Sequence, residues 1–172
     1  TSATDYLAYG SLIQWGRKPD GHELITWTNG TTGTAVNSTT GSQSNNPANA
    51  LFIIGYSDWR STQDDTLWAT EASANNPCPV GFRVPTNAEL TTLVTSSSIT
   101  NSATAASSAM KFTVPGYRSP SGGSLVSVGS YGYYWSSSVS GTYASYRYVY
   151  SAGMYINSND RANGFTVRCL KD

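Results

Sequence analysis

Charge is scarce in this chain. Only 12% of the 172 residues are charged, and 10 Lys and Arg balance 10 Asp and Glu to a formal net charge of zero. Binding to nucleic acid or to an anionic membrane through charge needs a basic surface, which this composition does not supply. No apolar run reaches the roughly 20 residues of a membrane span, and residues 1–5 lack a signal-peptide pattern. We expect no nucleic-acid partner and no direct membrane insertion, with any export signal or anchor outside the chain.

The residue types of common catalytic and metal sites are also few. His22 is the single histidine, so a Ser-His-Asp triad or a site built on several imidazoles would have to include it. It lies in a turn sequence, where a structural or surface role is expected. Asp64 and Asp65 could offer carboxylates to Ca²⁺, but no EF-hand spacing surrounds them. Because a phosphate-loop spacing is missing too, the sequence predicts no catalytic residue, no metal and no cofactor.

The two cysteines, Cys78 and Cys169, lie far apart in the chain. In a secreted domain an even count favours one disulfide, which here would close a long loop. Such a bridge would contribute up to about 4 to 5 kcal/mol through loop-closure entropy. The alternative is a pair of buried thiols.

Local patterns predict one domain with helices and short strands. Apolar spacing over residues 6–15 predicts a short amphipathic helix. The capping-box pattern of Thr86 and Glu89 starts a further helix, which ends in a polar loop over residues 95–108. Ser, Thr, Gly and Asn dominate residues 28–49, which are expected to form a long surface loop. Strands are expected at residues 110–117, 133–138, 146–150 and 165–170.

Tyrosine is concentrated in one part of the chain. Eight of the 12 tyrosines fall within residues 131–155. Within residues 146–150 they alternate with Arg147 and Val149, so in a strand the three rings share one face. One interpretation is sheet packing, to which Tyr is suited by its strand propensity. The other is a contact surface, because Tyr with Ser, Gly and Asn is typical of antibody paratopes.

Several segments together resemble the Fibrobacter succinogenes major paralogous domain, and the resemblance spans nearly the whole chain. They are residues 5–17, 76–86, 132–138 and 161–169. That family is similar to the formylglycine-generating-enzyme branch of the C-type lectin fold, with its Arg-x-Pro-Thr-x-x-Glu helix start and closing Gly-Phe-x-x-Arg strand. These motifs are here residues 83–89 and 164–168. The resemblance implies a single α+β, C-type lectin-like domain over residues 1–172, with two helices packed on small antiparallel sheets and long loops.

The chain also resembles the variable proteins of diversity-generating retroelements. In those proteins the stretch between the Trp-Ser-Ser strand and the last strand is hypervariable, which corresponds here to about residues 131–163. The retroelement mutates template adenines, so an Asn codon can become Tyr, Ser, Asn, Asp or Arg but not Met or Lys. Residues 143–160 fit this rule well, whereas Met154 does not and is expected to belong to the framework.

This resemblance implies a ligand-binding surface rather than an enzyme. The expected ligand-binding residues are Tyr143, Ser145, Tyr146, Arg147, Tyr148, Tyr150, Tyr155, Asn157, Asn159 and Asp160. The residues expected to hold this surface rigid are Trp135, Phe165, Cys78 and Cys169. The implied function is a receptor-binding protein or adhesin for a protein or glycan ligand on another cell surface. Its place would be extracellular, on a cell surface or phage particle, or in a larger displayed assembly.

Two other functions stay open. One is a bacterial cell-surface module, carbohydrate-binding or structural, without diversification. The other is an oxidase of the formylglycine-generating type, but that chemistry uses an active-site cysteine pair, whereas Cys78 and Cys169 fall at framework motifs. The Glu-Pro-Asn or Gln-Pro-Asp triplet of calcium-dependent sugar sites is missing near the binding stretch, so such sugar binding is not implied.

Overall fold

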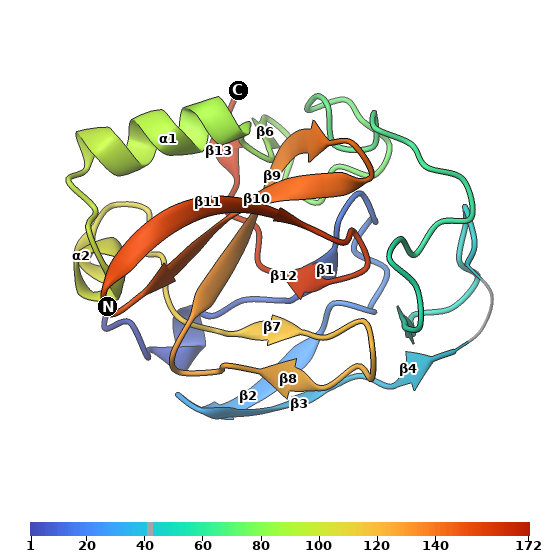
Figure 1. Ribbon diagram of the computed structural model, residues 1–172, viewed down its shortest axis with the longest axis horizontal. Helices are drawn as coiled ribbons and strands as arrows, with labels where there is room; N and C mark the ends of the chain where they lie inside the picture. The colour runs from blue at the N-terminus through green and yellow to red at the C-terminus, as the bar shows by residue number, and fades with distance from the viewer. Residues whose placement is uncertain (41–42) are drawn as a thin grey trace.

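The computed structural model in Figure 1 describes residues 1–40 and 43–172. Its helices and short, mostly antiparallel strands confirm the predicted mixed class of two helices with small sheets. In chain order the elements are η1 (Tyr6–Ala8), β1 (Ile13–Gln14), β2 (Ile25–Asn29), β3 (Thr32–Ala35), β4 (Ser38–Thr39), β5 (Phe52–Ile53), β6 (Phe82–Arg83), α1 (Asn87–Ser96), α2 (Ser102–Ser107), β7 (Tyr117–Arg118), β8 (Leu125–Val126), β9 (Gly132–Ser140), β10 (Tyr143–Tyr150), β11 (Gly153–Asn159), β12 (Gly164–Phe165) and β13 (Leu170–Lys171).

Both α-helices begin at capping boxes. At α1 the Thr86 hydroxyl accepts a hydrogen bond from the Glu89 amide at 3.2 Å, and the Glu89 carboxylate accepts one from the Thr86 amide at 2.8 Å. This confirms the helix start that the sequence predicts. The polar loop predicted over residues 95–108 is wrong in part, because the Asn101 side chain accepts from two amides of the next turn and caps α2.

The helix predicted over residues 6–15 does not form. The single turn of η1 is followed by Gly10 at φ 73°, a conformation that glycine adopts readily. Ile13 and Gln14 then pair with β12 as β1. Residues 12–17 are all buried, so this segment is enclosed on every side rather than along the single stripe of an amphipathic helix.

Two other expectations are corrected by strand pairing. The predicted loop over residues 28–49 contains β3, which pairs with β2, and β4, which pairs with β5. Gly41 and Ser42 of that loop lie outside the described residues. The strand predicted over residues 110–117 is reduced to β7, because residues 112–114 are buried as irregular backbone.

The longest strands form the three-stranded sheet β11–β10–β9. The predicted strands over residues 133–138 and 146–150 lie within β9 and β10, whereas β11 was not predicted and the run 165–170 divides between β12 and β13. In Figure 1 this sheet lies between α1 on one side and β12, β7 and β8 on the other. Contacts of α1 with β9 and β10, and of β12 with β9, agree with that layering.

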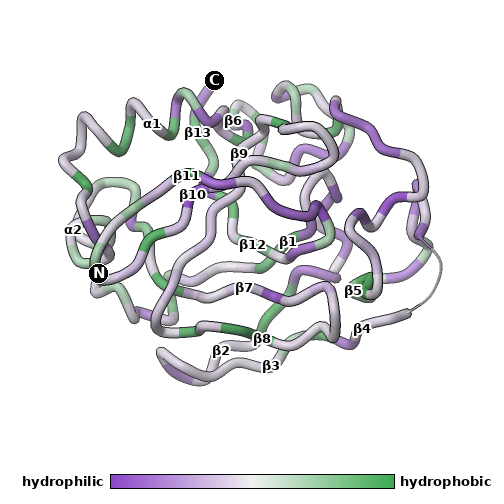
Figure 2. Tube along the Cα trace, in the orientation of Figure 1, coloured by the Kyte–Doolittle hydropathy of each residue, from purple (hydrophilic) through white to green (hydrophobic). Residues whose placement is uncertain are grey.

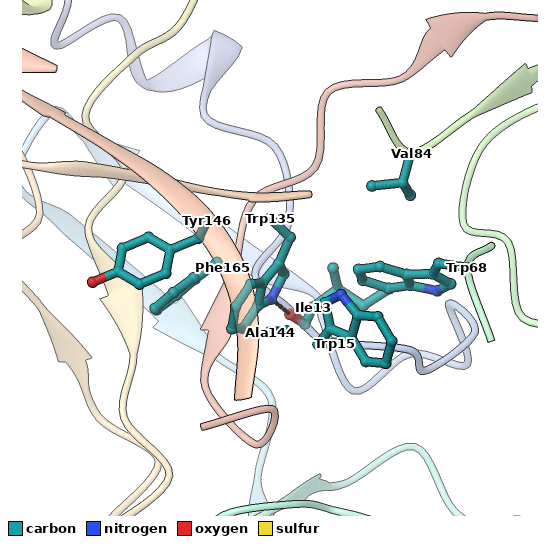
Figure 3. Close-up of a cluster of buried hydrophobic side chains, with 8 residues drawn as sticks. All are labelled: Ile13, Trp15, Trp68, Val84, Trp135, Ala144, Tyr146 and Phe165. Atoms are coloured by element: carbon teal, nitrogen blue, oxygen red, sulfur yellow. Dashed lines mark hydrogen bonds between the residues drawn. The ribbon is translucent and has the colours of Figure 1, made fainter. Parts of the chain in front are cut away.

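Two clusters of buried side chains fill the spaces on either side of this sheet. Figure 2 shows hydrophobic positions scattered along the trace rather than gathered in long runs, so the core is assembled from distant segments. The cluster on the β12 side is drawn in Figure 3 and contains Ile13, Trp15, Trp68, Val84, Trp135, Ala144, Tyr146 and Phe165. The cluster on the α1 side contains Leu90, Val94, Ile99, Ala105, Phe112, Tyr134 and Val149.

The residues expected to hold the sheet rigid lie in or beside the first cluster. Cys78 and Cys169 form a disulfide with a Cα–Cα distance of 5.7 Å, which confirms the predicted bridge and excludes the pair of buried thiols. The rings of Trp135 and Phe165 stack with centroids 4.2 Å apart, and Trp135 Nε1 donates to the carbonyl of Ile13 at 3.0 Å. Both rings are fully buried, so they anchor the inner end of the sheet.

Candidate binding surface

Six tyrosines of the β9–β10–β11 sheet and its approach form a continuous group on one face. Register pairs set Tyr148 opposite both Tyr133 and Tyr155, and Tyr146 opposite Trp135, so these side chains project to the same side. This confirms the shared face expected from the alternation in residues 146–150. We call this group the tyrosine row: Tyr131, Tyr133, Tyr146, Tyr148, Tyr150 and Tyr155.

Neighbouring rings of the tyrosine row lie in contact and many are nearly parallel. Tyr148 and Tyr150 have centroids 6.2 Å apart and ring planes 16° apart, and Tyr131 and Tyr150 lie at 5.1 Å and 19°. Tyr155 joins from β11 at 5.6 Å from Tyr148 and 6.1 Å from Tyr150. Each ring therefore limits the movement of the next, and the row presents a rigid aromatic surface.

Exposure rises along the tyrosine row. Tyr146 is 5% exposed and packs edge-on against Phe165 in the core, whereas Tyr155 is 47% exposed. Tyr131, Tyr133, Tyr148 and Tyr150 are half-buried between these two ends. The inner end thus belongs to the hydrophobic core, and the outer end is open to a partner.

The tyrosine row is electrically neutral at ordinary pH. Burial, together with the neighbouring phenols of Tyr146, Tyr117 and Tyr131, raises the pKa of Tyr133 to about 12, because each neighbour disfavours a second negative charge. Burial also raises the pKa of Tyr146 above its ordinary value, as does Tyr148. Tyr133 and Tyr146 therefore keep their phenol protons, and a tyrosine hydroxyl can both donate and accept a hydrogen bond.

An open hollow adjoins one end of the tyrosine row. Its volume is about 320 Å³, and its lining includes Tyr131, Tyr150, Ser151, Gly129 and Val114. Two of these are members of the row, so a ligand side chain resting on the row could reach into this hollow. The lining is uncharged, which matches the character of the row itself.

The remaining residues expected to bind ligand are distributed over several surfaces. Tyr143 is 46% exposed at the start of β10, away from the tyrosine row. Asn157 lies on the same face as the row, since it pairs with Tyr146. A side-chain hydrogen bond joins Asn159 to Tyr146. Asp160 lines a separate hollow with Tyr56 and other loop residues.

Ser145 and Arg147 lie on the opposite face of β10, where α1 covers them. Arg147 is 4% exposed, and its Nη2 donates to the Thr91 hydroxyl of α1 at 2.5 Å. Burial lowers the pKa of Arg147, but a guanidinium stays charged at neutral pH. Ser145 is 9% exposed, and its carbonyl accepts from the Ser136 hydroxyl at 2.9 Å. In this structure neither side chain contributes to the tyrosine row, contrary to the polar contact expected of Arg147.

Sequence reasoning placed Tyr131 and Tyr133 in the tyrosine cluster but did not include them among the binding residues. The signal that could have included them is the alternation of Tyr131, Tyr133 and Trp135, which gives all three the same face of a strand. Tyr133 contacts Tyr131, Tyr146 and Tyr148, so it lies at the centre of the row. The face of the sheet, and not the segment of sequence, defines the surface.

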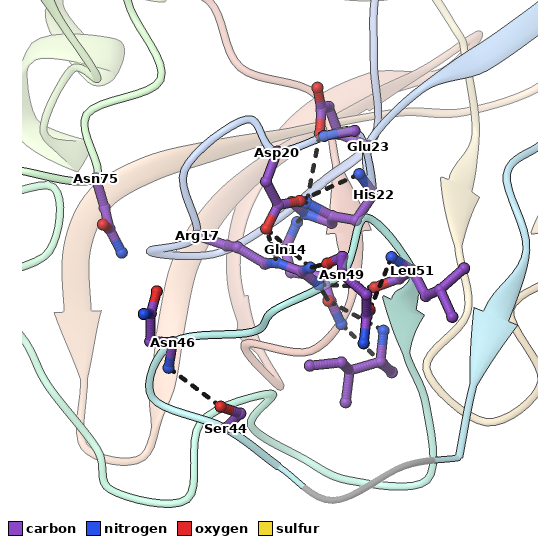
Figure 4. A network of polar contacts seen from close by, with 12 residues as sticks. Gln14, Arg17, Asp20, His22, Glu23, Ser44, Asn46, Asn49, Leu51 and Asn75 are labelled. Carbon is purple, nitrogen blue, oxygen red and sulfur yellow. Dashed lines mark hydrogen bonds and ion pairs between the residues drawn. The ribbon is translucent and has the colours of Figure 1, made fainter.

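Figure 4 shows the surroundings of the single histidine. His22 Nε2 accepts from the Gln14 amide at 3.1 Å, so the proton resides on Nδ1 and is donated to Asp20 at 2.7 Å. Asp20 also accepts from Arg17 Nε at 2.9 Å. This fully buried ring has a structural role, as expected, and burial lowers its pKa.

Asp20, His22 and Glu23 are the group within the described ranges, 1–40 and 43–172, whose ligand atoms lie close enough to hold a metal ion, all within 4.8 Å of one another. Both nitrogens of His22 already have hydrogen-bond partners, and Glu23 accepts from the Gly21 amide at 3.0 Å. A metal would have to displace Arg17 and the Nδ1 proton. The donor set therefore fits a polar network better than a metal site.

Within the part of the chain that the structure describes, no helix has the length and apolar character needed to cross a membrane. Comparison with protein-family models, with curated protein sequences and with solved structures finds no match to this chain.

Proposed function

We propose that this chain is a ligand-binding domain of C-type lectin-like fold that uses the tyrosine row as its contact surface. The ligand is a protein or glycan on another cell surface, and the domain acts as a receptor-binding protein or adhesin outside the cell. Residues 131–163 are the region that a diversity-generating retroelement alters. The observation that carries the proposal is the uncharged row of six tyrosines in mutual contact on one sheet face, buried at Tyr146 and open to solvent at Tyr155.

The chemistry of the tyrosine row supports binding. Tyrosine combines a large apolar ring with a hydroxyl group and loses little conformational entropy when it is held, which is why it dominates antibody contact surfaces. Contact between rings restricts the row before any ligand arrives, and so lowers the entropic cost of association. A neutral surface also needs no counter-charge on the ligand.

The β10–β11 hairpin supports diversification of this surface. Its backbone is held by a ladder of seven register pairs, from Ala144 with Asn159 to Tyr150 with Gly153. A ladder of main-chain hydrogen bonds does not depend on side-chain identity, so solvent-facing side chains can change without loss of the fold. Met154, the residue that adenine mutagenesis cannot reach, packs against the buried cluster under α1, as a framework residue should.

The disulfide favours binding over oxidation. An oxidase of the formylglycine-generating type needs reactive thiols, and both cysteines of this chain are joined to each other. The bridge also agrees with an extracellular location, because disulfides persist in oxidising compartments.

Binding is tested with an array of glycans and extracellular proteins probed with the wild-type domain. For any ligand found, Tyr148→Ala should weaken binding at least about tenfold without unfolding the domain, because a central aromatic anchor is removed. The matched control is Tyr56→Ala, an exposed tyrosine 37% accessible and outside the row. A loss below about twofold for Tyr148→Ala, or an equal loss for both variants, would contradict the use of this face.

Diversification is tested separately by sequencing the encoding locus in many cells or related isolates. Substitutions concentrated in the codons for residues 143–160 and at template adenines, with a reverse transcriptase and a near-copy of the segment nearby, would support the retroelement. Substitutions spread evenly would favour a cell-surface module with one fixed ligand. In either case, the effect of Tyr148→Ala on binding still tests whether the tyrosine row is the contact surface.

A further inference from the structure

The strand β11 forms one edge of the three-stranded sheet. β10 is its neighbour in the sheet order β11–β10–β9, and among the described elements β10 is the one that β11 contacts extensively. β9, at the other edge, is covered because the amide of Trp135 donates to the Thr166 carbonyl at 2.9 Å. The two edges of this sheet therefore differ, and the β11 edge faces outward.

The register identifies which backbone groups of β11 are turned outward. The Tyr133 carbonyl and the Trp135 amide both bond to Thr166, on the side of β9 away from β10. Because the direction of backbone groups alternates along a strand, those of Tyr134 point towards β10. The register partner of Tyr134 on β10 is Arg147, so the backbone amide and carbonyl of Arg147 point towards β9. The register partner of Arg147 on β11 is Ile156. The amide and carbonyl of Ile156 therefore point away from β10, to the free side of the sheet. By the alternation of antiparallel ladders, Met154 and Ser158 face the same way.

The outward groups of β11 have few partners within the chain. The Ser158 amide donates to Oδ1 of the neighbouring Asn157 at 2.8 Å. For Met154 and Ile156, neither the amide nor the carbonyl has such a side-chain partner among the described residues. Unpaired backbone groups in a row are a template for a further strand.

This edge also lacks the usual features that prevent strand addition. Natural sheet edges are protected by lysine, proline or a bulge, whereas β11 has the sequence Gly-Met-Tyr-Ile-Asn-Ser-Asn, without charge or proline. Its register with β10 is unbroken, so no bulge twists it away. Ile156 and Tyr155 are each 47% exposed, which leaves apolar surface beside the open edge.

We propose that β11 is a homodimer interface, in which β11 of a second copy pairs with it antiparallel about a two-fold axis at Ile156. Ile156 is the midpoint of the seven-residue strand, so this register overlaps every residue of both strands. The outward groups of Met154 then meet those of Ser158 in the second copy, and Ile156 meets itself. This proposal stands on the sheet edge alone and does not depend on the proposed ligand.

Charge favours a second copy as the occupant. The uncharged strand brings no like charges together when it pairs with itself, and Asp160, the next charged residue along the chain, falls opposite Ala152 in this register. A partner rich in Lys or Asp would find no opposite charge on β11. Self-pairing also buries Ile156 against Ile156 and sets Tyr155 beside Asn157 of the second copy, on the face of the tyrosine row.

The dimer would extend the binding surface. Pairing through β11 makes one six-stranded sheet, in which the two tyrosine rows lie on the same face with the two β11 strands between them. Both copies of α1 lie on the other face. A ligand with two sites, or a dense cell surface, would then be held by two rows at once, which increases avidity without any new contact.

The test is sedimentation equilibrium of the wild-type domain over a series of concentrations. We expect a monomer–dimer equilibrium that Ile156→Lys abolishes, since it places two like charges at the axis, while the matched control Ile156→Val retains it. An equimolar mixture of Ile156→Lys and Ile156→Glu should restore dimers, because opposite charges then meet. Unchanged circular dichroism and Tm would show that each variant is folded.

Three results would overturn the proposal: a wild-type monomer at every concentration, a dimer that Ile156→Lys leaves intact, or a charge-swap mixture that stays monomeric. Hydrogen exchange on the wild-type chain gives an independent measure that needs no variant. The amides of Met154 and Ile156 should exchange more slowly as concentration rises, and exchange that is independent of concentration would also contradict the dimer.

Discussion

The loops that join the short strands within residues 10–40 and 43–65 and the β9–β10–β11 sheet are held by different kinds of hydrogen bond. In the loops, buried arginines donate to backbone carbonyls: Arg17 bonds to the carbonyls of Leu51 and Asn49, both at 3.0 Å. Arg118, from β7, reaches into the same region through the carbonyl of His22 at 3.1 Å. In the sheet, backbone bonds to backbone along ladders: the β10–β11 ladder is unbroken, and the β9–β10 ladder has one register shift between Ala144 and Tyr146.

This difference determines which side chains can change. Where a side chain holds the backbone, replacing it leaves buried carbonyls without a donor and changes the shape of the loop. Where the backbone holds itself, the strand pairing does not depend on an outward-facing side chain. The tyrosine row contains side chains that differ in the same way. Its inner end packs in the core, whereas its outer end, at Tyr155, is exposed and free to change.

The largest effect is expected for Trp135→Ala. Trp135 is fully buried, stacks on Phe165 and donates to the Ile13 carbonyl, so its removal leaves a cavity and removes this hydrogen bond. The expected loss is about 3 to 5 kcal/mol in the free energy of unfolding, measured by chemical denaturation. An unchanged denaturation midpoint would show that the stability of the sheet does not depend on its buried inner end, at Trp135 and Phe165.

The next effect is expected for Arg118→Met. Arg118 donates to the carbonyls of Gly123 (2.9 Å), His22 and Val36 and to the Ser38 hydroxyl (2.9 Å), and its guanidinium lies 4.2 Å from the Phe52 ring centroid. Its loss should cost about 3 kcal/mol in the free energy of unfolding.

The control for Arg118→Met is Lys18→Met at an exposed position, which should change stability by less than about 0.5 kcal/mol. Equal midpoints for the two variants in a thermal denaturation series would contradict the role assigned to buried arginines in the loops.

Alkaline pH should weaken the fold through two tyrosines: Tyr9, whose hydroxyl donates to the Gly30 carbonyl at 2.7 Å, and Tyr133 of the sheet. Burial raises the pKa of Tyr9 to about 12, and the pKa of Tyr133 is raised to the same value. Between about pH 10 and about pH 12 the unfolded chain releases these protons while the folded chain retains them, so stability falls as pH rises. Below about pH 10 both states hold the protons, and the effect vanishes.

Thermal unfolding followed across this pH range checks the alkaline prediction. Tyr9→Phe and Tyr133→Phe should each flatten the fall, because each removes one titrating phenol without removing its ring. A pH profile that neither variant alters would show that these two groups do not cause the loss.

The smallest effect is expected for Tyr155→Ser. This side chain is 47% exposed at the outer end of the row, and its backbone is held by pairing with Tyr148. The free energy of unfolding should change by less than about 1 kcal/mol. A loss as large as that of Trp135→Ala would mean that the outer tyrosines are part of the core, and would remove the distinction between the two ends of the row.

Patterns of short range predicted their elements well. The capping box at Thr86 and Glu89 and the strands around residues 133–138 and 146–150 are all present. These signals depend on residues close together in the chain. The predicted helix over residues 6–15 is wrong because the segment pairs with β12, more than a hundred residues away, and β7 also pairs with β12, which lies far from it in the chain.

The candidate surface was predicted in part. The alternation within residues 146–150 correctly gave three tyrosines one face, but residue type alone could not separate Arg147, which α1 covers, from the exposed tyrosines. Tyr131 and Tyr133 join the surface through pairing of β9 with β10, which the sequence does not state. A contact surface is made by strand order, and strand order is a tertiary property.

The neutral composition, the capped start of α1 and the supply of tyrosines at alternate positions can all be read from the sequence. These follow from residue type and from a backbone period of two or 3.6 residues, which are local. Only the tertiary structure shows that buried arginines hold the loops and that β11 lies at an open edge. Each of these depends on which distant segments share one core, since burial excludes water and forces polar groups to find partners within the chain.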